Sequence, residues 1–577
     1  MTTMADTPEA VLDKYATERD KRLRSDQTAQ YVDFRDPILA SMDKDPYVDY
    51  NQLASKDFPL RDGSEVKVLI AGGGMLGILT AYHLVNQASV DSRDMVIVDK
   101  AGGFGGTWYW NRYPGISCDI EGYCYVPLLE ETSYMPKHRY CHGHEIREQL
   151  ERIAHMLNVP GQFCTTVTGQ KWDDQARRWV VTMSHTRGSG QEPEQLTVRA
   201  QFLILAGGIQ TSPHAPKLNG PDVFTQSPGK VLMHTARWDW SKTYAFLRGT
   251  TLPEGNDDRG WAKVAYKAGW QYERMASLDA IFTGQKDAQD VVQDSWTKVS
   301  GMVTMAGHAG KVITPDKEKV HVKEMIDIDY PWTESMRRRV DEEVHDVGTA
   351  QKLKAWYPGF CKRPTFHGEY LSLFNQLNVT LVDTNGKGFT AYTPEGVMAN
   401  DREYYLDVLV LATGYTVGLA DSTPSSALNA PLEGRNGRPL KDKWESDDYG
   451  ALGTVSQNAH SFYNLLSRLI SHLVKESLRA SNPEMTRVEV EKKAEDSWSE
   501  RVAERSLWLA AFPSCTPGYL TGEGLLQTMK NLSEEGQKQI AIGSYWGEGI
   551  LDFQKIVEIW MHEGKLEGVK IESWFDP

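Results

Sequence analysis

The sequence lacks several features that would assign it to a class at once. Over its 577 residues, no apolar run approaches the length of a membrane-spanning helix. The N-terminal stretch MTTMADTPEA lacks the basic and apolar regions of a signal peptide. There is no internal repeat of solenoid type and no low-complexity tract. We therefore predict a globular protein of the cytoplasm, without membrane insertion.

Cysteine and positive charge are both scarce. The six cysteines show neither C-x-x-C pairing nor the spacing of a metal site, so we predict reduced thiols and no bound metal. The formal net charge of −15 argues against nucleic acid and anionic membranes as partners. The hydrophobic content of 40% is ordinary for a globular protein. The sequence leaves the oligomeric state open.

What the sequence does contain is a nucleotide-binding pattern. The apolar run Val66–Ala71 has strand length and leads into Gly72-Gly73-Gly74-Met75-Leu76-Gly77, a G-x-G-x-x-G. Residues 78–85 then follow helical spacing, and a second apolar run, 95–98, ends at Asp99. Strand, glycine turn, helix and a placed acid form the dinucleotide fingerprint. The pattern predicts an α/β fold with a doubly wound, Rossmann-like domain.

Each residue type in the turn has a physical role. Gly72 allows the tight turn, Gly74 lets backbone N–H groups approach a pyrophosphate, and Gly77 allows helix and strand to pack closely. The helix that starts at Met75 offers unpaired N–H groups to the phosphates. Asp99 can accept hydrogen bonds from a ribose. A glycine turn without a ligand is the alternative, and the flanking strands argue against it.

The next stretch resembles a known family. Residues 105–115, GGTWYWNRYPG, followed by CDIE at 118–121, resemble the flavin-binding signature of type I Baeyer–Villiger monooxygenases. The resemblance covers most of the chain and implies FAD as the cofactor. It assigns cofactor contacts within the signature to Gly106, Thr107, Trp108, Tyr113 and Asp119.

The same resemblance implies a catalytic pair. Residues 361–364, CKRP, resemble the block that carries the family's active-site arginine, which is Arg363 here. Asp119 resembles the acid that orients this arginine. A fixed guanidinium can stabilise an anion formed during the reaction. The alternative is a buried pair that only supports the fold.

Later segments match the family in part. The run 408–411 predicts a second buried strand and ends in an intact A-T-G, which implies flavin contacts for Thr413 and Gly414. The family segment that follows is shortened in this chain, and the resemblance assigns Gln457 in it as a further flavin contact. In the motif at 224–239, His234 is expected to be structural.

The two ends of the chain carry less specific signals. The charged stretch 8–32 and Asp45-Pro46-Tyr47 resemble the N-terminal extension of the long-chain and macrocyclic-ketone branch, and we expect a surface helix on the flavin domain. Near the C-terminus, 462–478 and 488–512 are predicted helices.

One family module is missing from the pattern. The family carries a second strand–G-x-G-x-x-G–helix unit for NADPH, and the stretch 240–269 contains only isolated glycines that follow no apolar strand. The stretch is also too short for a βαβ unit, which takes roughly 30 residues or more with its own apolar runs. We therefore predict a truncated second nucleotide domain, replaced by a mainly helical region, and no ordinary use of NADPH.

These observations predict a domain plan and a function. We expect an N-terminal arm at 1–60, a flavin domain in two parts at 61–238 and 370–577, and a remnant with a helical cap at 239–369. The resemblance implies an FAD-dependent enzyme that acts on a bulky apolar ketone of terpenoid or polyketide type. The alternatives are a redox-neutral isomerase or cyclase, with FAD structural or absent, and a non-catalytic scaffold.

Overall fold

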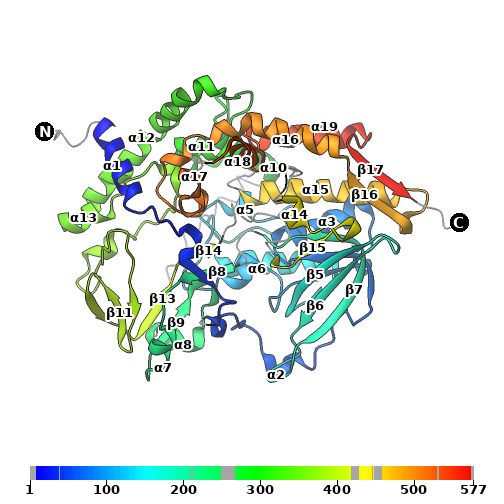
Figure 1. Cartoon of the computed structure of the whole chain (residues 1–577), viewed down its shortest axis with the longest axis horizontal. Coiled ribbons are helices and arrows are strands. Elements are labelled where there is room, and N and C mark those ends of the chain that lie inside the picture. Colours follow the sequence, from blue (N-terminus) through cyan, green and yellow to red (C-terminus); the bar gives the residue numbers. More distant parts are fainter. Residues whose placement is uncertain are drawn as a thin grey trace.

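The computed structural model describes residues 8–37, 39–208, 212–247, 267–416, 428–444, 446, 458–528 and 532–573. Figure 1 shows a mixed α/β molecule, with a large sheet at the lower right and long helices along the upper side. The predicted α/β class is confirmed. Within the described residues, no helix is long and apolar enough to cross a membrane.

The largest sheet is built around the nucleotide fingerprint. Its parallel centre consists of β2 (Glu65–Ala71), β3 (Met95–Val98) and β7 (Glu194–Leu205), with β2 in the middle. The strands β5 (Thr165–Asp173) and β6 (Arg178–His185) continue it as an antiparallel extension. The edges are β4 (Gly161–Gln162) and β15 (Leu432–Glu433), and the order is β15-β5-β6-β7-β2-β3-β4.

Alternate side chains of β2 enter two different cores. Val68 and Ile70 belong to a core shared with α3 (Met75–Ala88) and α6 (Gly143–Leu157). Leu69 belongs to a second core, which includes residues of the antiparallel extension. Successive side chains of a strand point to opposite faces, so a strand that is apolar at every position is buried on both. The glycine turn after β2 therefore follows a strand whose last four residues, Val68–Ala71, are buried.

A second group of strands is much smaller. β9 (Val231–His234) and β13 (Val408–Leu411) form a two-stranded parallel sheet. The strand predicted at 408–411 is thus present, but the prediction that it is buried is wrong for Val410, which is 37% exposed. Among the described strands, β13 pairs with β9 alone, so less of it is covered. An antiparallel meander lies nearby in sequence: β10 (Ala391–Tyr392), β11 (Gly396–Ala399) and β12 (Arg402–Tyr405).

A mainly helical region lies between β9 and this meander in the chain. Its longest element, α12 (Glu318–Glu343), runs along the upper left of Figure 1 and contains Pro331. The other described helices of this region are α8 (Trp240–Leu247), α10 (Trp270–Phe282), α11 (Val303–Ala306) and α13 (Val347–Leu353).

The N-terminal helix α1 (Pro8–Asp20) does not pack where we expected it. It lies beside α12 rather than on the flavin domain (Figure 1). Tyr15 accepts a hydrogen bond from Arg337 Nη1 of α12 at 2.7 Å, and Lys14 Nζ lies 5.7 Å from the Trp356 ring centroid. The sequence identified the helix, but its partners lie more than 300 residues away in the chain, beyond the reach of a local pattern.

The C-terminal part adds helices and one strand pair. The helix predicted at 462–478 is α15 (Ala459–Leu478), and it packs on α3. The helix predicted at 488–512 is wrong at its start, because β16 (Thr486–Val490) pairs with β17 (Val569–Ser573) and α16 covers only Lys492–Arg505. The strand partner lies far along the chain, so the sequence around Val488 gave no sign of it.

The prediction that all cysteines are reduced is wrong for two of them. Cys361 and Cys515 form a disulfide, with Cα atoms 5.2 Å apart and 154 residues between them in sequence. A spacing rule detects only local pairs, so this contact left no signal in the sequence. The remaining four, Cys118, Cys124, Cys141 and Cys164, are free and buried.

Candidate active site

The glycine turn has no room for side chains. Gly72 has a φ of +128°, and a Cβ there would lie 2.2 Å from the Ala206 carbonyl oxygen. A Cβ on Gly77 would lie 2.0 Å from the Gly72 oxygen. α3 starts at Met75, and the preceding Gly74 has no side chain to cap the helix. The first-turn N–H groups of α3 are therefore suited to a phosphate ligand.

The signature stretch forms a second wall beside this turn. The Gly105 N–H donates to the Gly73 oxygen at 2.9 Å. Gly106 has a φ of +55°, and a Cβ on it would lie 2.7 Å from the Gly74 Cα. The short helix α4 (Thr107–Trp110) begins directly after Gly106. Two glycine-rich loops thus meet backbone to backbone, which leaves their N–H groups close to any bound pyrophosphate.

Asp99 lies at the end of β3 and binds the turn itself. Its Oδ2 accepts from the Gly73 N–H at 2.7 Å, and its Oδ1 accepts from the Ala101 N–H at 2.8 Å. Burial raises the pKa of Asp99. Each carboxylate oxygen can accept more than one hydrogen bond, so a contact with a ribose hydroxyl stays available. The sequence indicated the ribose contact but not this bond to the turn.

The other predicted signature residues lie around this wall. Trp108 is buried, and its Nε1 donates to the Tyr125 hydroxyl at 3.2 Å. Thr107 is exposed at the start of α4. Tyr113 is half-buried, and burial raises the pKa of its hydroxyl. Their contacts with a cofactor stay predictions.

The structure brings the two predicted catalytic residues together. Arg363 donates to both oxygens of Asp119, from Nη1 at 2.9 Å and from Nη2 at 2.5 Å, although 244 residues separate them in sequence. Burial alone would lower the pKa of Arg363, but the hydrogen bond to Asp119 raises it above its ordinary value. The guanidinium thus stays charged and held in one plane.

A tryptophan from the helical region completes this pair. The Arg363 guanidinium carbon lies 4.9 Å from the centre of the Trp296 ring. Asp294 holds this segment in place, because its Oδ1 accepts from the Trp296 N–H at 2.9 Å and from the Thr297 N–H at 3.2 Å. The sequence analysis missed Trp296, since only the fold brings it to the arginine.

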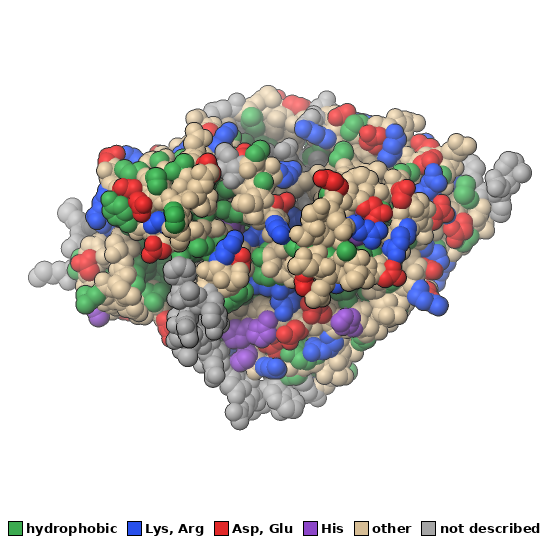
Figure 2. Space-filling model, turned by 90° about the horizontal axis from the view of Figure 1, so that it is seen from below, with side chains coloured by type: hydrophobic (Ala, Val, Ile, Leu, Met, Phe, Trp, Pro, Cys, Tyr) green, Lys and Arg blue, Asp and Glu red, His purple; other side chains and the backbone are tan. Residues whose placement is uncertain are grey.

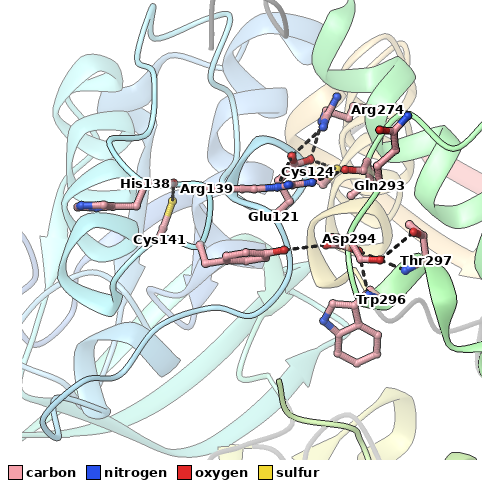
Figure 3. A network of polar contacts seen from close by, with 12 residues as sticks. Glu121, Cys124, His138, Arg139, Cys141, Arg274, Gln293, Asp294, Trp296 and Thr297 are labelled. Carbon is pink, nitrogen blue, oxygen red and sulfur yellow. Dashed lines mark hydrogen bonds and ion pairs between the residues drawn. The ribbon is translucent and has the colours of Figure 1, made fainter. Parts of the chain in front are cut away.

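A buried ion cluster lies close to the pair in sequence. Glu121, only 1% exposed, accepts from Arg274 at 2.5 and 2.7 Å and from Arg139 at 3.2 Å. Figure 3 shows Arg139 and Arg274 converging on Glu121, with Asp294 and Trp296 drawn below. The cluster joins the flavin signature to α10. The sequence analysis assigned it no role, although Glu121 lies in the CDIE stretch that resembles the family.

Two other predicted positions, Thr413 and Gly414, form hydrogen bonds with His214. The Thr413 hydroxyl donates to the His214 oxygen, and the Gly414 oxygen accepts from the His214 N–H at 3.2 Å. These bonds connect β14 (Tyr415–Thr416) to β8 (Ser212–Pro216). Gln457 lies outside the described residues.

His234 behaves as a buried structural histidine. Its Nδ1 accepts from the Ala236 N–H at 3.0 Å, and burial lowers its pKa to about 4. It is therefore neutral at physiological pH.

In the part of the chain that the structure describes, no group of His, Cys, Asp and Glu side chains is arranged to hold a metal ion. The face in Figure 2 carries interspersed acidic and basic side chains rather than one continuous basic area.

Known proteins are similar to this chain in sequence and fold. Residues 70–133 match the model of the NAD(P)-binding Rossmann-like domain. A polycyclic ketone monooxygenase of Thermothelomyces thermophilus is 35% identical over 644 residues, which cover 97% of this chain and 96% of the relative. The Baeyer-Villiger monooxygenase ATR8 of Stachybotrys chlorohalonatus is 32% identical over 98% of this chain and 94% of its own. The chain belongs to the family of FAD-binding, Baeyer–Villiger-type monooxygenases.

Solved structures agree with this membership. The polycyclic ketone monooxygenase from the thermophilic fungus has a TM-score of 0.89 and 32% identity, over 98% of this chain and 99% of that one. The closed structure of cyclohexanone monooxygenase, at 20% identity and a TM-score of 0.61, shares the fold. The predicted family, the enzyme class of flavoprotein monooxygenases and FAD as cofactor are confirmed.

Proposed function

We propose that this chain is an FAD-dependent monooxygenase for a bulky, apolar, polycyclic ketone, and that it does not take hydride from NADPH in the family's usual way. The observation that carries the first part is the Arg363–Asp119 pair, whose Asp119 follows the predicted flavin signature in sequence. The second part concerns the region after Trp240.

The residues present fit FAD. The first turn of α3 and the backbone of Gly105 and Gly106 suit the pyrophosphate, and Asp99 suits the ribose. Bound FAD would supply the oxygen-dependent redox chemistry of the family. Arg363 would stabilise negative charge that develops at the substrate carbonyl, and Asp119 would keep the guanidinium oriented toward it.

The surroundings of Arg363 suit an apolar substrate. Trp296 contacts Phe366 and Phe282, with ring centroids 5.1 and 5.9 Å away. This buried aromatic cluster gives Arg363 apolar surroundings, which favour a large hydrophobic substrate over a polar one. The similarity to the polycyclic ketone monooxygenase of Thermothelomyces thermophilus supports the same class.

Two observations support the proposal that NADPH does not reduce the flavin in the family's usual way. Residues 239–369, as far as the structure describes them, contain no strand, whereas a nucleotide-binding half of a doubly wound fold has at least three parallel strands. The alignment with the Thermothelomyces thermophilus relative runs over 644 residues, more than the 577 of this chain, so it contains gaps on the side of this chain. The first favours a reduced second domain, and the second shows that the relative has residues that this chain lacks.

An anaerobic reduction experiment tests the proposal. The purified protein should show flavin absorbance, should keep it for minutes after NADPH is added, and should lose it at once on photoreduction. Admission of oxygen with a panel of polycyclic ketones should then give a product with one added oxygen atom.

Rapid bleaching by NADPH would overturn the second part of the proposal. Bound flavin without any oxygenated product, after photoreduction, would favour the redox-neutral isomerase or cyclase instead. Product formation therefore tests the first part of the proposal, and bleaching by NADPH tests the second.

A further inference from the structure

The N-terminal region runs from the helical cap to the flavin signature. We use "N-terminal strap" for residues 8–50. Its first helix lies on the cap, where Tyr15 bonds to Arg337. Its middle crosses β8, where Tyr31 stacks on His214 with ring centroids 3.9 Å apart. Its end reaches the flavin signature.

Asp45, near the end of the strap, binds both ends of the signature loop. Its Oδ2 accepts from the Gly102 N–H at 3.0 Å and from the Tyr109 hydroxyl at 2.8 Å. Its Oδ1 accepts from the Tyr47 N–H at 2.9 Å. The Asp45 residue is only 4% exposed. A single carboxylate oxygen therefore holds the loop 102–109 closed at its base.

The loop needs such an anchor. It contains Gly105 at φ +130° and Gly106 at φ +55°, the two residues that face the glycine turn. Glycine loses more backbone freedom on ordering than any other residue, so an unanchored loop of this composition would sample many shapes. Fixing Gly102 and Tyr109 to one atom removes much of that freedom before the cofactor binds.

Further contacts keep the strap on the loop independently of Asp45. The Arg112 guanidinium lies 3.9 Å from the Tyr47 ring centre and 4.4 Å from that of Tyr109. The Tyr47 hydroxyl donates to the Trp110 oxygen at 3.2 Å. A change at Asp45 therefore removes the anchor while leaving this packing in place.

We propose that Asp45 is a positioning residue for the FAD cradle, and that docking of the N-terminal strap and binding of FAD are thermodynamically linked. The strap orders the loop that contacts FAD, so each event strengthens the other by the same factor. This inference needs FAD binding only, and it is independent of how the flavin is reduced.

Titration of the apo-protein with oxidised FAD, followed by quenching of flavin fluorescence, tests the role of Asp45. Asp45→Ala should weaken FAD binding about 10-fold or more, since it removes a buried ionic acceptor of two hydrogen bonds. Asp45→Asn should weaken it about 3-fold, because the amide oxygen still accepts.

A matched control lies in the same strap. Asp49 accepts from the Asn51 and Gln52 N–H groups at the start of α2 (Tyr50–Leu53) and is exposed. Asp49→Ala should change FAD affinity by less than about 2-fold. Equal affinities for the Asp45→Ala and wild-type proteins, or equal losses for Asp45→Ala and Asp49→Ala, would refute the positioning role.

Limited trypsin digestion tests the linkage without any catalytic readout. Cleavage in the strap, at Lys21, Arg22 or Arg24, should be several-fold slower with FAD bound than without it, and Asp45→Ala should abolish this difference. Identical cleavage rates for the wild-type apo- and holo-proteins would disprove the linkage. If Asp45→Ala fails to fold, Tyr109→Phe removes one of the two bonds, and unchanged FAD affinity in that variant counts against the proposal.

Discussion

Two regions of this chain, the large sheet around β2 and the strand pair β9–β13, differ in how far their strands are covered. In the flavin region, β2 lies between β3 and β7, and all residues from Val68 to Ala71 are buried. In the second region, β13 has one strand partner among the described residues, and Val410 is exposed. Both strands are apolar runs that precede a glycine. The difference shows that such a run indicates a strand, while its burial depends on the layers that the rest of the chain supplies.

Substitution of a glycine should destabilise the first region more than the second. Gly77→Ala places a Cβ 2.0 Å from a backbone oxygen, so it should cost more than about 3 kcal/mol in the free energy of unfolding. Gly414 has a φ of +86° and open space around it, so Gly414→Ala should cost only about 1–2 kcal/mol. Urea unfolding and flavin content measure both. Similar losses in the two variants would mean that the second region is as tightly packed as the first.

The catalytic pair joins the flavin signature to the helical region and is the next point to break. Arg363→Lys keeps the charge but loses the two-pronged bond to Asp119, so turnover should fall about 100-fold with flavin binding intact. Turnover is measured with photoreduced enzyme and a polycyclic ketone. Arg339→Lys is the matched control, because Arg339 forms a comparable pair with Glu343 on the surface of α12. An unaffected Arg363→Lys enzyme would reduce the pair to a fold-supporting role.

Each region also holds a buried histidine that should make it sensitive to acid. Burial lowers the pKa of both His234 and His460 to about 4. The unfolded chain binds the proton more tightly, so stability present above about pH 6.5 is lost as the pH falls toward 4. Between about pH 7.5 and about pH 5, each histidine should remove about 2 kcal/mol of stability.

Variants at the two histidines measure how much each one contributes to the pH dependence of stability. The His460 Nδ1–H donates to the Cys124 oxygen at 3.0 Å, so Gln can replace it as a donor. His234→Gln and His460→Gln should each flatten the dependence of unfolding free energy on pH. A variant whose pH dependence matches the wild type would show that folding does not shift the pKa of that histidine.

The smallest expected change in unfolding free energy comes from Val→Thr substitutions in the strands β3 and β13. Val98→Thr on β3 buries a hydroxyl in a closed core and should cost about 1–3 kcal/mol. Val410→Thr on β13 should stay within about 0.5 kcal/mol, because the side chain already meets solvent. Thermal unfolding of the pair is sufficient to compare them. A large loss at Val410 would reveal a layer over β13 that the described residues do not include.

The local part of the site could be predicted from sequence, and the long-range part could not. The turn from Gly72 to Gly77 follows from a strand, glycines and a helix within a short window. The pairing of Arg363 with Asp119 came from the family resemblance rather than from spacing. Trp296 and Asp45 were missed, because each meets its partners through contacts between distant segments that no periodicity records.

The errors have the same origin. Val488 follows an apolar pattern compatible with a helix, yet a strand near the C-terminus pairs with it. Cys361 and Cys515 share no motif, and only the packed fold brings their sulfur atoms together. Val410 was expected to be buried because its neighbours in sequence are apolar, although burial is set by neighbours in space.

The bond between Cys361 and Cys515 turns a large part of the chain into a covalent ring. The ring closes 154 residues and contains both Arg363 and the helix α15 that packs on the flavin domain. In the chain-entropy account, closing a ring of this size disfavours the denatured state by about 5 kcal/mol. Even in the denatured ensemble, the disulfide keeps the segment just before Arg363 tethered to the segment around Cys515. These two segments therefore stay close together when the rest of the fold is lost.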